Sequence, residues 1–446
     1  MSTELRFPPG FRWGTATSAY QVEGATRADG RGESVWDRFC RVPGAIENGD
    51  TGDDACQHYH RADEDVALMA SLGLNAYRLS LAWPRIFPAG DGRLEPRGLA
   101  HYDRLVDRLL AHGITPLVTL YHWDLPQPLQ DRGGWRDRAT AHRFADYAAA
   151  CFDAFGDRVR DWVTINEPWI VGVLGHQLGL HAPGERDVAG SVRAMHHLLL
   201  GHGLAAGALR ATGRPDARAG VAYSLFPHTP AADTDADRAA AHGSDGYVNR
   251  WFLDPVHGRG YPADVREHWE NAVGPLDFVA DGDERTIAAG SDFIGVNYYT
   301  RRIVSAGRGD GPFPWKVEPG RDDVPRTDLN WEIVPDELTG LLLRLHRDHP
   351  GVPLLVTENG AVLDDDRRVA FLHGHLAAVH RALAAGAPVE GYYHWSFLDN
   401  FEWAMGYRPR FGLVHVDRTT QRRTVKDSGR WYAAAARSGA IPPWPA

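Results

Sequence analysis

Short apolar runs alternate along the chain with longer segments in which apolar residues recur at helical spacing. The apolar or β-branched runs stop near eight positions, at Gly14, Ala82, His122, Glu167, Phe226, Tyr299, Glu358 and Trp395. Amphipathic helices are predicted between them, for example over residues 61–72, 97–112 and 366–385, and a glycine suited to a helix C-cap follows each of these three segments. Such alternation is typical of βαβ units around a parallel sheet.

Eight strand–helix repeats without a linker between them predict an α/β fold that closes into a single (β/α)8 TIM barrel, one domain over residues 1–446. Closure removes both edges of the sheet. An open doubly wound sheet is the alternative, but that fold usually carries a Gly-rich phosphate loop, and the chain has neither a G-x-G-x-x-G nor a P-loop motif. The long connections at residues 16–60 and 300–335 are expected to lie over one mouth of the barrel.

Composition and charge narrow the class of protein. Hydrophobic residues make up 43% of the chain and charged residues 24%, which is ordinary for a globular protein. Lys and Arg number 48 against 58 Asp and Glu, a net charge of −10 without a basic block, so no nucleic-acid partner is expected. The chain has no membrane-length apolar stretch, residues 1–11 lack the charged and apolar regions typical of a signal peptide, and its three cysteines are scattered. We therefore expect a cytoplasmic protein with no membrane partner.

Two glutamates stand where predicted strands end. In a (β/α)8 barrel the functional groups lie at the C-terminal ends of the strands, and Glu167 and Glu358 occupy two such positions. A carboxylate at the end of an apolar strand is costly to bury unless it has a partner. Two of them facing across one barrel mouth indicate acid/base or nucleophilic chemistry.

The second and sixth predicted strands offer partners for these carboxylates. Strand alternation places Arg78 on the face opposite Tyr77 and Leu79, so Arg78 points into the barrel if the apolar face meets helices. Asn297 and Tyr299 likewise share one face. An arginine and a tyrosine hydroxyl around one carboxylate would hold it ionised as a nucleophile, while the other carboxyl could carry a proton.

Tryptophan is the other signal in the composition. The chain has 15 tryptophans, and several lie at predicted strand ends or just beyond them: Trp123, Trp169, Trp331, Trp395 and Trp403. Flat aromatic faces beside hydrogen-bonding side chains suit a sugar ring, which has apolar C–H faces and a polar rim. Two carboxylates at such a site indicate hydrolysis of a glycosidic bond.

An ordered set of motifs extends over nearly the whole chain. These are FRWGTATSAYQVEG at 11–24, TINEP at 164–168, TENG at 357–360, WSFLDNFEW at 395–403 and RFGL at 410–413. Together they resemble the motifs of glycoside hydrolase family 1, the β-glucosidase family. The resemblance implies that Glu358 attacks the anomeric carbon and that Glu167 is the acid and then the base of a retaining mechanism.

The same resemblance implies roles for further residues. Arg78 and Tyr299, with Asn297 beside them, would support the nucleophile. The residues that would bind the glycone are Gln21, His122, Trp123, Asn166, Trp395, Glu402, Trp403 and Phe411, with Asn166 on the 2-hydroxyl and Trp395 under the ring. Trp169 and Trp331 would line the leaving-group subsite. A non-proline cis peptide is expected at Trp395-Ser396.

These observations predict a retaining β-glycosidase without a cofactor that releases terminal β-D-glucosyl residues, with β-galactosyl and β-fucosyl residues as alternatives, from small glycosides. No metal is expected, because the His58-x-His60 pair has no apparent third ligand. Two alternatives stay open: a 6-phospho-β-glycosidase, although that group replaces the carboxylate at Glu402, and a catalytically silent sugar-binding barrel. A homo-oligomer is also left open.

Overall fold

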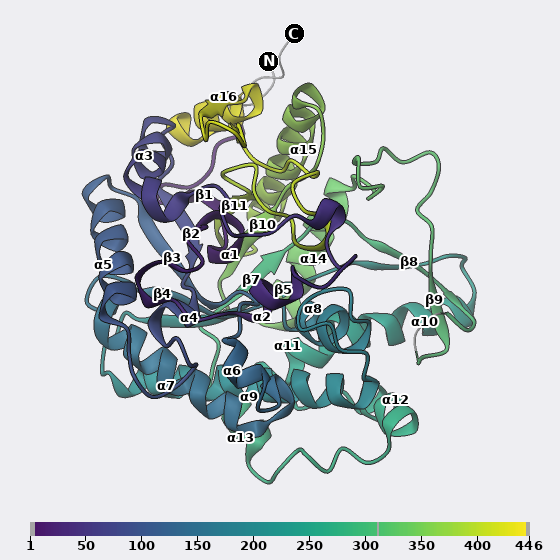
Figure 1. Ribbon diagram of the computed structural model, residues 1–446. Helices are drawn as coiled ribbons and strands as arrows, with labels where there is room; N and C mark the ends of the chain where they lie inside the picture. The colour runs from purple at the N-terminus through teal and green to yellow at the C-terminus, as the bar shows by residue number, and fades with distance from the viewer. Residues whose placement is uncertain (1–4, 310–311, 443–446) are drawn as a thin grey trace.

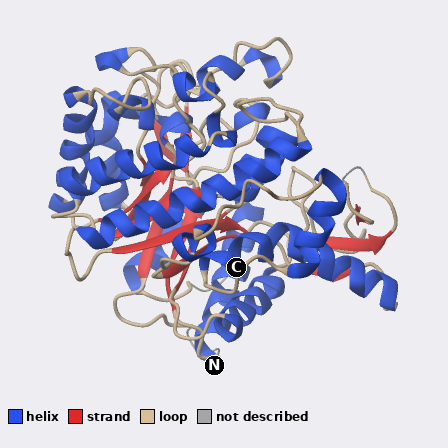
Figure 2. Ribbon diagram, turned by 90° about the horizontal axis from the view of Figure 1, so that it is seen from below, coloured by secondary structure: helices blue, strands red, loops and turns tan. Residues whose placement is uncertain are grey.

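Eight parallel strands close into a barrel with helices around it (Figures 1 and 2). The computed structural model describes residues 5–309 and 312–442. Around the barrel the strands follow the order β1-β11-β10-β7-β5-β4-β3-β2. They are β1 (Arg12–Ala16), β2 (Ala76–Ser80), β3 (Thr115–Tyr121), β4 (Asp161–Asn166), β5 (Arg218–Ser224), β7 (Phe293–Asn297), β10 (Leu354–Asn359) and β11 (Val389–Trp395). The predicted (β/α)8 barrel is therefore confirmed.

The helices predicted from apolar spacing are found in the expected places. The longer helices are α3 (His58–Ser71), α5 (Pro96–Ala111), α7 (Arg138–Phe155), α9 (Val188–Ala211), α10 (Asp235–Asp245), α12 (Ala263–Val273), α14 (Pro335–Asp348), α15 (Asp365–Ala384) and α16 (Asp427–Ser438). Short helices of three to six residues are α1 (Ala19–Val22), α2 (Val35–Phe39), α4 (Trp83–Ile86), α6 (Gln127–Gln130), α8 (Pro168–Ile170), α11 (Trp251–Val256) and α13 (Asp283–Ile287). Gly73, Gly113 and Gly386 follow α3, α5 and α15 with φ of +79°, +70° and +95°, the left-handed conformation that ends a helix.

Five further strands lie outside the barrel. The strands β6 (His228–Pro230), β8 (Arg302–Ala306) and β9 (Trp315–Glu318) form one sheet, which lies beside α10 (Figure 1), and β12 (Val414–Val416) pairs with β13 (Arg423–Val425). The connection at 300–335, expected as a loop, thus contains two strands. Its remaining part carries Trp331 to the mouth of the barrel.

Alternation along the strands separates the barrel interior from the layer between strands and helices. A buried cluster inside the barrel comprises Ala16, Ala76, Leu117, Val163, Ala222, Phe293, Leu355, Tyr393, Trp395 and Phe411. Tyr77 and Leu79 belong to a second, larger cluster, which also includes apolar residues of the surrounding helices. Arg78 lies between them in sequence and points inward, where it contacts residues of other barrel strands. The predicted orientation of Arg78 follows from this two-residue period.

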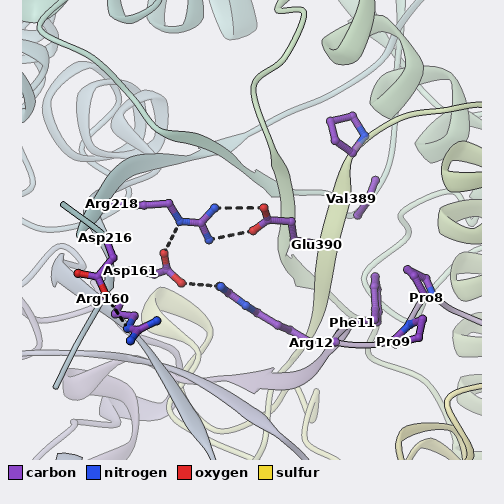
Figure 3. A pocket seen from close by; sticks show the side chains of 12 residues that line it. Pro8, Pro9, Phe11, Arg12, Arg160, Asp161, Asp216, Arg218, Val389 and Glu390 are labelled. Atoms are coloured by element: carbon purple, nitrogen blue, oxygen red, sulfur yellow. Dashed lines mark hydrogen bonds and ion pairs between the residues drawn. The ribbon is translucent and has the colours of Figure 1, made fainter.

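Ion pairs cross the barrel at the amino ends of its strands (Figure 3). Asp161, the first residue of β4, lies 2.6 Å from both Arg12 of β1 and Arg218 of β5, and Arg218 also pairs with Glu390 of β11 at 2.8 Å. These side chains line a cavity of about 520 Å³. The charges at this end are paired with one another, whereas the cavity at the opposite end is lined largely by aromatic residues. Among the described residues, no helix has the length and apolar character needed to cross a membrane.

Candidate active site

The two glutamates come together at the C-terminal end of the barrel. Glu167 directly follows β4, and Glu358 lies near the end of β10; their side chains are almost completely buried, with residue exposures of 5% and 4%. Asn297, at the end of β7, donates its amide to Glu167 Oε1 at 2.8 Å and also interacts with the carboxylate of Glu358. Both carboxyl groups therefore meet at one amide side chain.

Glu358 is surrounded by groups that favour its ionised form. Arg78 Nη1 donates to Glu358 Oε1 at 2.6 Å, and the Tyr299 hydroxyl donates to Oε2 at 2.7 Å. Burial raises the pKa of Glu358, and the charge of Arg78 and the hydrogen bond from Tyr299 oppose that rise. Of the two glutamates, Glu358 is the one with a direct cationic partner.

Glu167 has the opposite electrostatic environment. Burial and the negative charge of Glu358 raise the pKa of Glu167 to about 8, although hydrogen bonds from Asn297 and Ser224 act against this rise. The charge of Arg78 thus favours the anion on Glu358, and the proton of the pair is held preferentially by Glu167. A glycosidase that acts through a nucleophile and a general acid needs one ionised and one protonated carboxyl group in this way.

A hydrogen-bond network connects Arg78 to the wall of the cavity. Arg78 Nη2 donates to Asn166 Oδ1 at 2.6 Å, and Asn297 Nδ2 donates to the same oxygen at 3.0 Å. The Asn166 amide nitrogen therefore faces His122 Nε2, at 3.1 Å. Burial and the charge of Arg78 hold the pKa of His122 well below its usual value, so this imidazole is neutral. The network orients both side chains toward the site where the glycone is expected.

A cavity of about 370 Å³ opens above the two glutamates. The residues of the predicted site that line it are His122, Trp123, Glu167, Trp169, Tyr299, Trp331, Glu358, Trp395, Glu402, Trp403 and Phe411. The other four predicted residues, Gln21, Arg78, Asn166 and Asn297, are buried and are not among the residues that line it. Gln21 donates to the Phe401 carbonyl at 2.8 Å and to Glu402 Oε2 at 3.4 Å, so it acts on the cavity through Glu402.

Aromatic rings form one end of this cavity. The His122 ring lies nearly parallel to the rings of Trp395 and Trp403, and its centroid is 5.9 Å and 6.0 Å from theirs. The ring centroids of Trp403 and Trp123 are 4.5 Å apart. Burial and the charge of Glu358 raise the pKa of Glu402 to about 8. The peptide bond between Trp395 and Ser396 is cis, as expected from the resemblance.

Several lining residues escaped the sequence analysis. Ser224, the last residue of β5, interacts with Glu167, and the rule that functional groups stand at strand ends would have found it. His181, Phe226 and Arg302 also line the cavity, from segments outside the barrel strands. Phe226 stands where the fifth strand is predicted to end, so the same rule indicates its position, whereas no local pattern in the sequence indicates His181 or Arg302 as parts of the site.

No metal centre is found in the part of the chain that the structure describes, where no three or more His, Cys, Asp or Glu side chains gather as ligands would. His58, of the His-x-His pair, instead pairs with Asp65 at 2.8 Å. His58 and Asp65 are both buried, and Arg423 also contacts Asp65, at 2.8 Å. This cluster is a buried ionic network and lies outside the lining of the cavity.

A (β/α)8 barrel with two buried carboxyl groups in unequal charge environments at the base of an aromatic cavity is typical of glycoside-cleaving enzymes. The family model "Glycosyl hydrolase family 1" matches residues 3–440. The chain belongs to this family. It is similar to thermostable beta-glucosidase B of Thermobispora bispora, with 48% identity over 98% of this chain and 92% of the relative.

Two solved structures share the fold and much of the sequence. The crystal structure of the AHE enzyme from Alicyclobacillus herbarius has a TM-score of 0.94 and 47% identity, covering 98% of this chain and 99% of that one. A beta-glucosidase from Thermotoga maritima in complex with glucoimidazole has a TM-score of 0.93 and 41% identity, again covering 98% and 99% of the two chains.

Proposed function

We propose that this protein is a retaining β-glucosidase that removes terminal β-D-glucosyl residues from small glycosides. β-Galactosyl and β-fucosyl residues are the alternative glycones. The observation that carries the proposal is the unequal charge environment of the two buried glutamates: Arg78 and Tyr299 stabilise the anion of Glu358, while the pKa of Glu167 is raised to about 8. The relatives from Thermobispora bispora and Thermotoga maritima are both beta-glucosidases.

In the first step, Glu358 attacks the anomeric carbon as the bond to the leaving oxygen breaks. Glu167 transfers its proton to that oxygen, so the aglycone departs as a neutral alcohol or phenol. The products are a glucosyl ester of Glu358 and an ionised Glu167. Esterification removes the negative charge of Glu358, and this lowers the pKa of Glu167, which suits its next role as a base.

In the second step, Glu167 takes a proton from water as the water oxygen attacks the anomeric carbon from the side the aglycone left. The ester bond breaks, Glu358 recovers its carboxylate, and the sugar is released with its β configuration. Arg78 and Tyr299 favour this step, because they stabilise the carboxylate that departs.

The remaining residues of the site receive binding roles in this proposal. At the glycone end, Trp395 packs under the sugar ring, and His122, Trp123, Glu402, Trp403 and Phe411 surround its rim from the cavity wall. Asn166 keeps one amide hydrogen for the 2-hydroxyl, since its oxygen is occupied by Arg78 and Asn297. Gln21 orients Glu402 from behind. Trp169 and Trp331 line the leaving-group side.

Hydrolysis of 4-nitrophenyl β-D-glucoside, followed by proton NMR of the released sugar, tests the proposal. β-Glucose should appear first, and Glu358→Gln should lose activity on the order of 10⁴-fold or more. The exposed Glu267→Gln is a matched control that should stay active. Turnover only of the glucoside 6-phosphate would favour the phosphoglycosidase alternative, and glucose binding without turnover would favour a silent sugar-binding barrel.

We further propose a cytoplasmic location and a single catalytic domain over residues 1–446. The three buried cysteines, Cys40, Cys56 and Cys151, are free thiols, which suits a reducing compartment. The continuous family match supports one domain. The proposed reaction requires a β-glycoside and no cofactor, metal, nucleic acid or membrane. A homo-oligomer stays a prediction that light scattering would test.

A further inference from the structure

The leaving-group side of the cavity contains an arginine, Arg302, the first residue of β8. Its guanidinium carbon lies 4.6 Å from the ring centroid of Trp169 and 4.4 Å from that of Phe226. Both aromatic side chains also line the cavity. The guanidinium group is therefore held between two flat apolar faces on the wall that the aglycone would contact.

Arg302 differs from the neighbouring arginines in having no acidic partner. Arg301 pairs with Glu332 at 2.7 Å and Glu337 at 3.1 Å, and Arg78 pairs with Glu358. In the described parts of the chain, no carboxylate lies within 4.0 Å of the Arg302 guanidinium. The ionisable groups that face it are the Tyr247 hydroxyl and the buried, neutral imidazole of His228.

Arg302 is thus a positively charged side chain with no carboxylate paired to it. Burial lowers the pKa of its guanidinium to about 10, which leaves the group positively charged at neutral pH. Arg302 is half-buried, and because its close contacts are aromatic rings its guanidinium group has unused hydrogen-bond donors. An anion bound at this position would supply the missing acceptor, and its interaction would be strengthened by the partly dehydrated surroundings.

Charge is distributed unevenly along the cavity. Glu358, the carboxyl group that Arg78 and Tyr299 favour in its ionised form, lies at the reacting bond, where a further anion would meet like charge. Arg302 lies instead beside Trp169, which follows the acid Glu167 by two residues and faces the leaving group in the proposed function. An anion is therefore attracted to the leaving-group side of the cavity, where Arg302 lies.

We propose that Arg302 makes the leaving-group subsite selective for flat aromatic aglycones that carry a carboxylate. Trp169, Phe226 and Trp331 would contact the aromatic ring, and the planar guanidinium fork would bind the carboxylate through two parallel hydrogen bonds. The inference rests on the proposed β-glucosidase function and adds the substrate class that its aglycone side prefers. The bond that breaks and the roles of the two glutamates are unchanged.

A pair of matched substrates tests this preference. We would measure kcat/KM for 4-carboxyphenyl β-D-glucoside and for its neutral methyl ester, in the wild type and in Arg302→Gln. The two phenols differ in acidity, but this difference cancels when the acid-to-ester ratio is compared between proteins. The ratio should fall by about tenfold or more in Arg302→Gln, mainly through a higher KM for the acid, because a charge-assisted bidentate contact is lost.

Two further variants separate charge from packing. Arg302→Lys should keep an intermediate ratio, since the lysine retains the charge and loses the fork. Arg308→Gln, at an exposed position in the loop that follows β8, removes the same charge away from the cavity and should leave the ratio unchanged. If Arg302→Gln lowers kcat/KM for both substrates equally, Arg302 is only a spacer between the rings and the inference is overturned.

Wild-type inhibition provides a test that does not depend on the variant folding. 4-Hydroxybenzoate should inhibit more strongly than its methyl ester, and its advantage should decline as salt is added. Weaker inhibition by the acid overturns the inference. Hydrolysis of phenyl β-D-glucoside separates failure of the Arg302 proposal from failure of the proposed function. If the protein cleaves this glucoside but does not prefer the acid, only the role of Arg302 is refuted. If it cleaves no glucoside, the proposed function is refuted.

Discussion

Arg78 donates a hydrogen bond of 2.6 Å to Glu358, joining β2 to β10 across the interior of the barrel. The same guanidinium group donates to Asn166 at 2.6 Å, next to Glu167 in the chain. One buried cation thus holds the nucleophile in its ionised form and positions an amide beside the acid. The charge asymmetry of the two glutamates follows from this placement.

Replacement of Arg78 by glutamine should move the acid limb of the activity profile to higher pH. Without the guanidinium charge, burial and Glu167 would dominate the environment of Glu358, so its pKa would rise and less of it would be ionised at pH 6. We expect kcat/KM at that pH to fall by about 100-fold or more, as expected for a lost charge pair. The pH dependence of kcat/KM measures the shift.

Arg78→Lys is the informative companion, because it keeps the charge and loses part of the hydrogen-bond network. Its acid limb should lie between those of the wild type and Arg78→Gln. Thermal unfolding of both variants would verify that they are folded. An acid limb that stays in place in Arg78→Gln would show that Tyr299 and Asn297 alone keep Glu358 ionised.

The alkaline limb should report on Glu167. This group must carry a proton to release the aglycone, and its pKa is raised to about 8 by burial and by the charge of Glu358. Activity should therefore be retained below that pH and decline as the pH rises through it, by about tenfold for each further unit. Measurement of kcat/KM from pH 5 to 10 would show the decline.

The contribution of Glu358 to this pKa is separable. In Glu358→Gln the neighbouring negative charge is absent, so the pKa of Glu167 should decrease toward the ordinary range for a carboxyl group. Carbon NMR of protein labelled at the glutamate carboxyl would follow the titration directly. A pKa that stays near 8 would mean that burial alone raises it.

At the opposite end of the barrel, Asp161→Asn should reduce stability and leave catalysis intact. Asp161 is 3% exposed and bridges Arg12 and Arg218, each at 2.6 Å, as Figure 3 shows. Losing one partner of a buried pair leaves two guanidinium groups short of a counter-charge, and we expect a cost of about 3 kcal/mol in the free energy of unfolding. Urea denaturation measures this cost, while kcat at a temperature where the protein is folded should match the wild type. An unchanged midpoint would show that Glu390 and solvent compensate.

Most of the barrel could be predicted because its strands are buried on both faces and therefore appear as apolar runs. Each predicted strand end lies within two residues of the observed one. β8 and β9 were not predicted. They are short and partly exposed, and β8 pairs with β6, which is far from it in sequence, as well as with the nearby β9. Their strand character arises from those pairings more than from their own pattern.

The site could be predicted to a similar extent, for a similar reason. Glu167 and Glu358 follow from their positions at strand ends, and Arg78 follows from strand alternation together with the cost of burying an unpaired charge. Arg302 could not be predicted in this way, because its setting is created by Trp169 and Phe226, which come from different segments of the chain. The electrostatic state of Glu402 likewise depends on burial and on Glu358.

Replacement of Glu167 by glutamine should make the rate depend steeply on the leaving group. The amide can still accept the hydrogen bond from Asn297 but has no proton to transfer. Glucosides of weakly acidic phenols should lose about 10²- to 10⁴-fold in kcat/KM, the usual worth of general acid catalysis. The 2,4-dinitrophenyl glucoside should lose far less in its first step, since its phenolate departs without protonation. Its ester with Glu358 should then accumulate, because the base for water is missing, and rapid mixing with mass spectrometry should detect a burst and one hexosyl group on Glu358. An equal loss for all leaving groups would show that Glu167 positions the substrate and does not protonate it.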